Sequence, residues 1–150
     1  MTNSVIATSA AEKWFDNFIA QLRVFEVELE TNTATQEVKN FFEKIFAGNA
    51  DEIVHLGKIA AQQHFVARII LDYLAAIKSN RPVRLAFDFN DSEVLVWAEI
   101  ADDHENMERQ LLKAEAVINA KYHPYGFDME STIVEVSDKL NIPNHYRVVN

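Results

Sequence analysis

The sequence of 150 residues contains no cysteine, and this absence removes several kinds of chemistry. Disulfide bridges, thiolate nucleophiles and zinc sites with cysteine ligands all need that sulfur atom. Only three glycines and three prolines are present, so the glycine-rich loops that cradle phosphates or dinucleotides are missing as well. Because no stretch has the composition of a linker, we predict one domain spanning residues 1–150.

Positive charge is scarce too. Lysine and arginine number 14 against 23 aspartates and glutamates, which gives a net charge of −9. Nucleic-acid binding needs clustered basic side chains for the phosphates, and anionic lipid surfaces attract the same side chains. We therefore expect no nucleic-acid partner. Because a long apolar run and the basic start of a signal peptide are also missing, we expect no membrane association and a cytoplasmic location.

Catalytic motifs are the last group of absences. The five histidines never stand three or four residues apart on one expected helix, and H-E-x-x-H does not occur. No serine lies in a G-x-S-x-G elbow. These absences favour a protein that acts by binding rather than an enzyme, and they predict no cofactor.

Apolar residues make up 49% of the chain, and their spacing predicts three helices before residue 80. Apolar residues recur every three or four positions after a capping box at Ser9, again over residues 34–47, and from Asp51 to about Lys78. The first eight residues are expected to be loose, and Gly57 marks a kink or a close-packing point. The second half of the third helix is apolar on more than one face, which is typical of a central helix or an oligomer interface.

A β-hairpin is predicted next, because apolar and polar residues alternate over 83–90 and again over 93–100. A turn at Asp91-Ser92 places Arg84 opposite Glu99. A turn at Asn90-Asp91 shifts every pair but leaves the same side chains on each face. The assignment of residues to the two faces is therefore independent of the turn.

The remainder of the chain predicts one more helix and one or two strands. Asp102 or Asp103 caps the helix, and a strand over residues 127–137 follows. Its alternation slips near Ser131-Thr132, which a bulge or a late strand start explains. A helical connection makes this strand parallel to the second hairpin strand if the two are neighbours. Residues 146–149 either add a short edge strand or wrap the body. The fold class is α+β, with three N-terminal helices packed with a small, mostly antiparallel sheet in the order α-α-α-β-β-α-β.

The polar face of the hairpin is the predicted binding surface. It carries Arg84 and Glu99 together with two large apolar side chains, Leu95 and Trp97. Aromatic and arginine side chains supply most of the binding energy at protein interfaces. The sequence therefore predicts a protein partner at this face, although cover by the chain itself also explains the apolar residues. We also predict a homodimer, formed through the third helix or this hairpin face.

An acidic run after the hairpin supports a second hypothesis. Asp102, Asp103 and His104 offer oxygen and nitrogen ligands for a divalent metal, which would generate a hydroxide in a metal-assisted hydrolase. The same acids are also favoured simply by the dipole of a helix first turn.

Two further sites remain open. A polar pocket forms if Asp88, Glu99, His123 and Tyr146 converge. A carrier of an apolar small ligand is a third functional class, because the phenylalanine-rich helices can line a cavity as well as a core.

Overall fold

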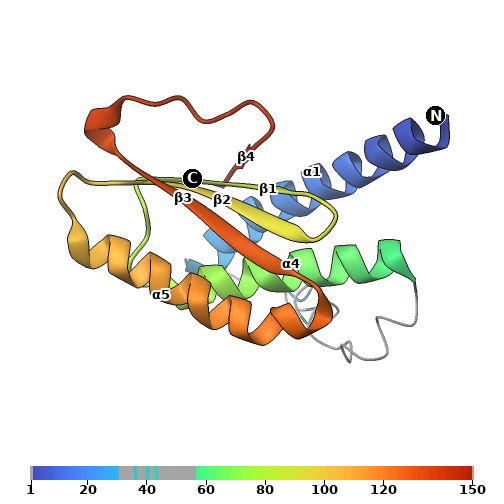
Figure 1. Ribbon diagram of the computed structural model, residues 1–150, viewed down its shortest axis with the longest axis horizontal. Helices are drawn as coiled ribbons and strands as arrows, with labels where there is room; N and C mark the ends of the chain where they lie inside the picture. The colour runs from blue at the N-terminus through green and yellow to red at the C-terminus, as the bar shows by residue number, and fades with distance from the viewer. Residues whose placement is uncertain (1, 31–35, 37–39, 41–42, 44–56, 150) are drawn as a thin grey trace.

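The computed structural model describes residues 2–30, 36, 40, 43 and 57–149. Its elements are the helices α1 (Thr2–Glu30), α4 (Lys58–Ala76) and α5 (Glu105–Tyr122), the strands β1 (Arg84–Phe89), β2 (Glu93–Ile100), β3 (Asp128–Glu135) and β4 (Arg147–Val148), and the 3-10 turns η1 (His123–Tyr125) and η2 (Val136–Asp138). The α+β class is confirmed (Figure 1). The order differs in detail from the prediction, because the described helices and strands follow one another as α-α-β-β-α-β with a short β4 at the end. The helix predicted over residues 34–47 falls mainly outside the described residues.

The first residues of helices α1 and α4 differ from those predicted. Helix α1 already begins at Thr2, so Ser9 lies inside the helix and the first residues are not loose. Alanines at 7, 10 and 11 favour the helical state, and an interior serine costs only a fraction of a kcal/mol relative to alanine, roughly 0.5. Helix α4 begins directly after Gly57, whose φ of 111° is incompatible with a helix interior.

The sheet has the strand order β3-β2-β1-β4. Strands β1 and β2 are antiparallel with Arg84 opposite Glu99, which selects Asp91-Ser92 as the turn. The Asn90 side-chain oxygen accepts hydrogen bonds from the backbone N–H groups of Ser92 and Glu93 at 3.1 and 2.9 Å and thereby fixes this turn. Strand β3 is parallel to β2, as predicted from the helical connection.

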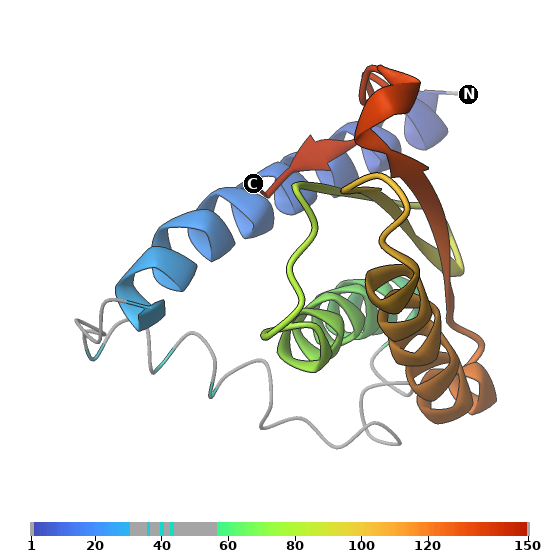
Figure 2. The same cartoon turned by 90° about the vertical axis from the view of Figure 1, so that its left-hand side faces the viewer.

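Helices α4 and α5 cover one face of the sheet (Figure 1), and α1 lies beside the sheet at the β4 edge (Figure 2). Phe65, Ile69 and Ile70 of α4 have no exposed surface and belong to the core between these elements. The all-round apolar character of this helix therefore reflects a central position, and the prediction of a dimer through these side chains is wrong. No helix in the described part of the chain is long and apolar enough to cross a membrane.

The other face of the sheet is covered by residues 139–149, called here the C-terminal segment (Figure 2). Ile142 and Tyr146 of this segment pack on a small apolar cluster of Ala86, Trp97 and Val134. The segment ends as β4, which pairs with β1. Both predicted roles of the chain end, edge strand and cover, are thus present.

Strand β3 pairs with β2 without interruption from Asp128 to Glu135, so the predicted bulge near Ser131 is wrong. Instead, Ser131 is placed on the helix side of the strand, where its backbone N–H donates to the Glu115 carboxylate at 2.6 Å. A polar residue on the inner face, and not an extra residue, breaks the apolar alternation.

The free edge of β3 is capped by side chains of α5. Asn119 accepts from the Met129 N–H at 2.7 Å and donates to the Met129 C=O at 3.1 Å, as a neighbouring strand would. Together with the Glu115 bond to Ser131, these contacts occupy edge groups that would otherwise pair with another chain. This edge is therefore closed to strand addition unless α5 side chains are displaced.

Candidate functional site

The predicted binding surface comes together in the structure but lies under the C-terminal segment. The Arg84 guanidinium donates two hydrogen bonds to the Glu99 carboxylate at 2.7 and 2.9 Å and lies 5.3 Å from the centre of the Trp97 ring. Trp97 is only 3% exposed and Glu99 only 5%. Leu95, opposite Asp88 on the same face, is half-buried. A partner therefore reaches Trp97 only where the segment is displaced.

Arg84 joins this surface to the segment. Besides its two bonds to Glu99, its guanidinium donates to the Leu140 carbonyl at 3.0 Å. Hydrogen bonding to Arg84, opposed by burial and aided by the opposite charge, lowers the pKa of Glu99 below its ordinary value. Glu99 thus remains charged beside Trp97, and it orients the arginine that holds the segment.

The C-terminal segment is basic, and the rest of the chain is acidic. Residues 139–150 contain Lys139 and Arg147 and no acid, so residues 1–138 alone carry a net charge of −11 against −9 for the whole chain. His145 Nδ1 lies 2.6 Å from the Asp88 carboxylate, and Arg147 Nε donates to Asp16 of α1 at 2.6 Å. The body of the protein therefore already holds one short basic segment by ion pairs, hydrogen bonds and apolar contacts.

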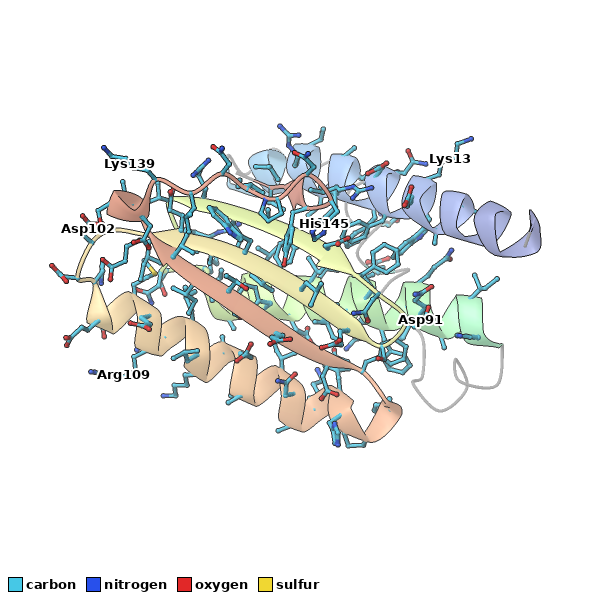
Figure 3. The ribbon with its side chains drawn as sticks, turned by 45° about the horizontal axis from the view of Figure 1, so that its top comes forward. Lys13, Asp91, Asp102, Arg109, Lys139 and His145 are labelled. Carbon is cyan, nitrogen blue, oxygen red and sulfur yellow. The ribbon has the colours of Figure 1, made fainter. Side chains whose placement is uncertain are left out.

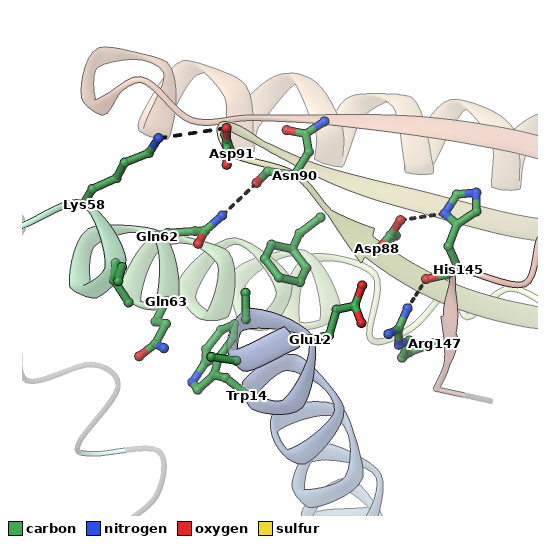
Figure 4. A pocket seen from close by; sticks show the side chains of 14 residues that line it. Glu12, Trp14, Lys58, Gln62, Gln63, Asp88, Asn90, Asp91, His145 and Arg147 are labelled. Carbon is green, nitrogen blue, oxygen red and sulfur yellow. Dashed lines mark hydrogen bonds and ion pairs between the residues drawn. The ribbon is translucent and has the colours of Figure 1, made fainter. Parts of the chain in front are cut away.

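A groove of about 450 Å³ opens next to the segment, between α1, the start of α4 and the end of the hairpin (Figure 4). Its apolar wall includes Trp14 and Phe89, whose ring centroids lie 6.2 Å apart in an edge-on arrangement. Gln62 and Gln63 of α4 also line the groove. A volume of this size accommodates a large side chain or a small molecule.

The rim of the groove is charged. Its acids are Glu12, Asp88 and Asp91, and its bases are Lys58 and Arg147. Arg147 is engaged by Asp16, while Lys58 lies 3.9 Å from Asp91 in an ion pair that water surrounds almost fully. Glu12 has no hydrogen bond or ion pair with any described residue, and it points into the groove in Figure 4. The rim thus offers an unengaged carboxylate beside an aromatic wall.

The groove has no hydroxyl or thiol among its described lining residues, none of which is Ser, Thr, Tyr or Cys. Asp88 holds the His145 ring through Nδ1, which leaves Nε2 for a ligand or a proton. This histidine therefore has no hydroxyl or thiol to activate there.

The three residues of the metal hypothesis have three different roles in the structure. Asp102 accepts from the Ser137 N–H at 2.8 Å. Asp103 has a left-handed φ of 56° in the turn, and His104 caps α5 by accepting from the Met107 N–H at 3.1 Å. The predicted cap at Asp102 or Asp103 is wrong because those residues are used in the preceding turn. Among the described residues, no group of three or more potential ligands is arranged to hold a metal ion.

The hypothetical polar pocket is only partly formed. Burial and the nearby carboxylates of Asp88 and Glu130 raise the pKa of Tyr146, which places this tyrosine in the same electrostatic environment as Asp88. His123 instead lies 2.9 Å from Asp128, and Glu99 is bound to Arg84. Two of the four residues therefore share a neighbourhood.

Sequence reasoning missed most of the groove. Trp14 was assigned to the apolar stripe of the first helix, and Asp91 to a turn; each does have that role. Glu12, Lys58 and Gln62 come from helices whose relative placement no spacing reveals. His145 carried a weak signal, because it stands in a cluster of polar aromatic residues near the chain end.

Comparisons of the chain with protein-family models, with curated proteins and with solved structures find no match.

Proposed function

We propose that this protein is a non-enzymatic binding module whose groove takes a positively charged, amphipathic segment of a partner protein. The observation that carries the proposal is the aromatic wall of Trp14 and Phe89 beside the unengaged carboxylate of Glu12. A protein partner and a cytoplasmic location, both expected from the sequence, belong to this proposal.

The apolar side chains of the partner's segment fit the aromatic wall of the groove. Trp14 is half-buried, so part of its ring is covered by Phe18 and Phe89 and part faces the groove. Tryptophan anchors bury a large area with few rotatable bonds, and such side chains dominate protein interfaces. An aliphatic or aromatic side chain that enters the groove covers this remaining apolar surface.

The positive charges of the partner's segment complement the acidic rim of the groove and the negative charge of residues 1–138. Glu12 is free to pair with a lysine or an arginine, and the −11 charge of residues 1–138 attracts cationic segments over longer range. The protein's own C-terminal segment has the same chemistry, since it places His145 and Arg147 against Asp88 and Asp16. These contacts lie at the rim of the groove itself, since Asp88, His145 and Arg147 are among its lining residues.

Binding of fluorescent peptides tests the proposal. An amphipathic peptide with alternating lysine and aromatic residues should bind, and its glutamate-substituted analogue should not. We expect Glu12→Lys to weaken binding about three- to tenfold, because it replaces an attraction by a repulsion at a solvated rim. Glu108→Lys makes the same charge change at an exposed position of α5 and should leave the affinity within about twofold.

Equal binding of the two peptides would contradict the proposal. Equal loss in the two variants would also contradict it, since it would show that overall charge and not the groove decides binding. Trp14→Ala should abolish the saturable part of the signal, and unchanged thermal melting of each variant shows that the fold is retained.

A further inference from the structure

We propose that the C-terminal segment is exchanged between two copies of the chain, so that residues 140–149 of each copy lie on the sheet of the other in a closed homodimer. The inference rests on the contacts of the segment and not on the ligand of the groove. It returns the surface of Arg84, Leu95, Trp97 and Glu99 to the role of an interface, with a second copy as the occupant.

Every contact of the segment with the body can form between copies. Arg84 binds the Leu140 carbonyl, Asp88 binds His145, Asp16 binds Arg147, and the Val149 N–H donates to the Leu85 carbonyl at 2.8 Å. These hydrogen-bond and ion-pair partners lie on α1 and β1, far from the segment in sequence. A second copy presents the identical surface, so an exchanged segment keeps all of these contacts.

The charge distribution favours the C-terminal segment as the part that is exchanged between copies. It is the only basic end of an acidic protein, with two cationic residues and no acid over residues 139–150. Two bodies repel each other, while each attracts the other's segment. Exchange therefore places the opposite charges at the contact where two acidic copies approach.

The residues at the start of the segment provide the hinge. Lys139, directly after η2, has a φ of 51° in the left-handed region, which side-chain-bearing residues adopt only at a cost. Val136 and Leu140 on either side of it are 45% and 48% exposed. An extended hinge relieves the strain at Lys139, and two hinges that cross in a dimer cover these apolar side chains. Figure 3 shows Lys139 near Asp102 at one end of the sheet and His145 over the sheet towards Asp91, so the segment crosses the sheet from that hinge.

A cross-link between β1 and β4 reports which copy supplies the segment. Ala86 lies opposite Val148. The Val149 N–H donates to the Leu85 C=O, so Leu85 and Val149 form the neighbouring hydrogen-bonded pair. Because such pairs alternate along antiparallel strands, Ala86 and Val148 form a pair that is not hydrogen-bonded. Such pairs have Cα atoms about 4.5 Å apart, within the range of a disulfide. Because the chain has no cysteine, the variant Ala86→Cys/Val148→Cys contains no competing thiol.

The experiment combines light scattering on the wild-type chain with non-reducing electrophoresis of the oxidised variant. We expect a solution mass of twice 17.2 kDa and a covalent dimer that reduction returns to single chains. Wild-type chain that is monomeric at every concentration overturns the proposal, and so does a disulfide that closes within one chain. In both cases the occupant of the surface is the chain's own segment.

Two controls separate exchange from random oxidation. Ala86→Cys refolded together with Val148→Cys should give a covalent heterodimer, whereas neither single variant alone should. Lys139→Gly, which removes the cost of the left-handed backbone, should raise the dimer dissociation constant about tenfold. An unchanged dissociation constant would remove the hinge from the mechanism. Peptide binding by Glu12→Lys is measured separately, so exchange and groove binding fail independently.

Discussion

Removal of the Asn119 side chain tests the claim that α5 closes the edge of β3. In Asn119→Ala, the Met129 N–H and C=O lose both partners while Met129 itself is only 3% exposed. A typical hydrogen bond contributes about 0.5–1.5 kcal/mol, and an unsatisfied buried group costs about 1–3 kcal/mol. Alanine has a higher helix propensity than asparagine, which offsets this loss of stability by about 0.5 kcal/mol. The expected loss in the free energy of unfolding is therefore about 2–4 kcal/mol.

The assay is urea unfolding followed by circular dichroism. For a chain of this length, 1 kcal/mol corresponds to about 2–4 °C in the melting temperature, so thermal melts should show a drop of about 5–15 °C. Asn106→Ala is the matched control, because it makes the same substitution at an exposed position of the same helix and should change stability by less than about 0.5 kcal/mol. We also expect the Asn119 variant to aggregate faster, since the freed edge can pair with other chains.

Similar stability of the two variants would refute the reasoning. It would show that water replaces the side chain at Met129 without cost and that the edge needs no cap. Asn119→Asp refines the result, because its ionised carboxylate keeps an acceptor for the Met129 N–H but loses the donor to the C=O; at neutral pH its stability should lie between wild type and alanine.

Two further predictions concern pH and the acidic turn. Burial, and then the hydrogen bond to Asp72, raises the pKa of Tyr122; a raised folded-state pKa means that its contribution to stability is complete below the unfolded-state pKa of about 10 and is lost as the pH rises above it. The urea midpoint should therefore fall above about pH 10, and Tyr122→Phe, which has no ionisable hydroxyl, should show a shallower fall; equal slopes would exclude Tyr122 as the cause. At the other end of α5, His104→Ala should cost about 1 kcal/mol through loss of the helix cap, and divalent metals should not shift the melting temperature of wild type or of Asp102→Asn/Asp103→Asn. A metal-dependent shift that the double variant loses would restore the hydrolase hypothesis.

The sequence alone was sufficient for the elements whose signal is local. The hairpin faces follow from alternation over residues 83–100, and a turn within residues 90–92 follows from three short polar side chains in a row. The buried stripe of Phe15, Phe18, Ile19 and Leu22 follows from their helical spacing. In each case the periodicity of the backbone and the burial of apolar side chains act on residues that are neighbours in the chain.

Other features were decided only by tertiary structure. The apolar half of α4 was equally consistent with a core and an interface, and only its position between α1, α5 and the sheet decides for the core. Trp97 was predicted to contact a partner because it lies on the polar face of the hairpin. Only the path of the C-terminal segment shows that this side chain is covered. The slip in the alternation at Ser131 was explained wrongly, because the Glu115 side chain that receives its N–H comes from another element.

The groove marks the same limit most clearly. Glu12, Trp14, Lys58, Asp88 and His145 lie on four segments, and no local pattern requires them to meet. Composition determined the acidic character and the absence of thiol chemistry, and the spacing of apolar residues along the chain determined the α+β class. Where the charges gather, and which of them stay unengaged, depends on how the helices and the chain end pack on the sheet, and long-range packing has no periodicity that a single sequence displays.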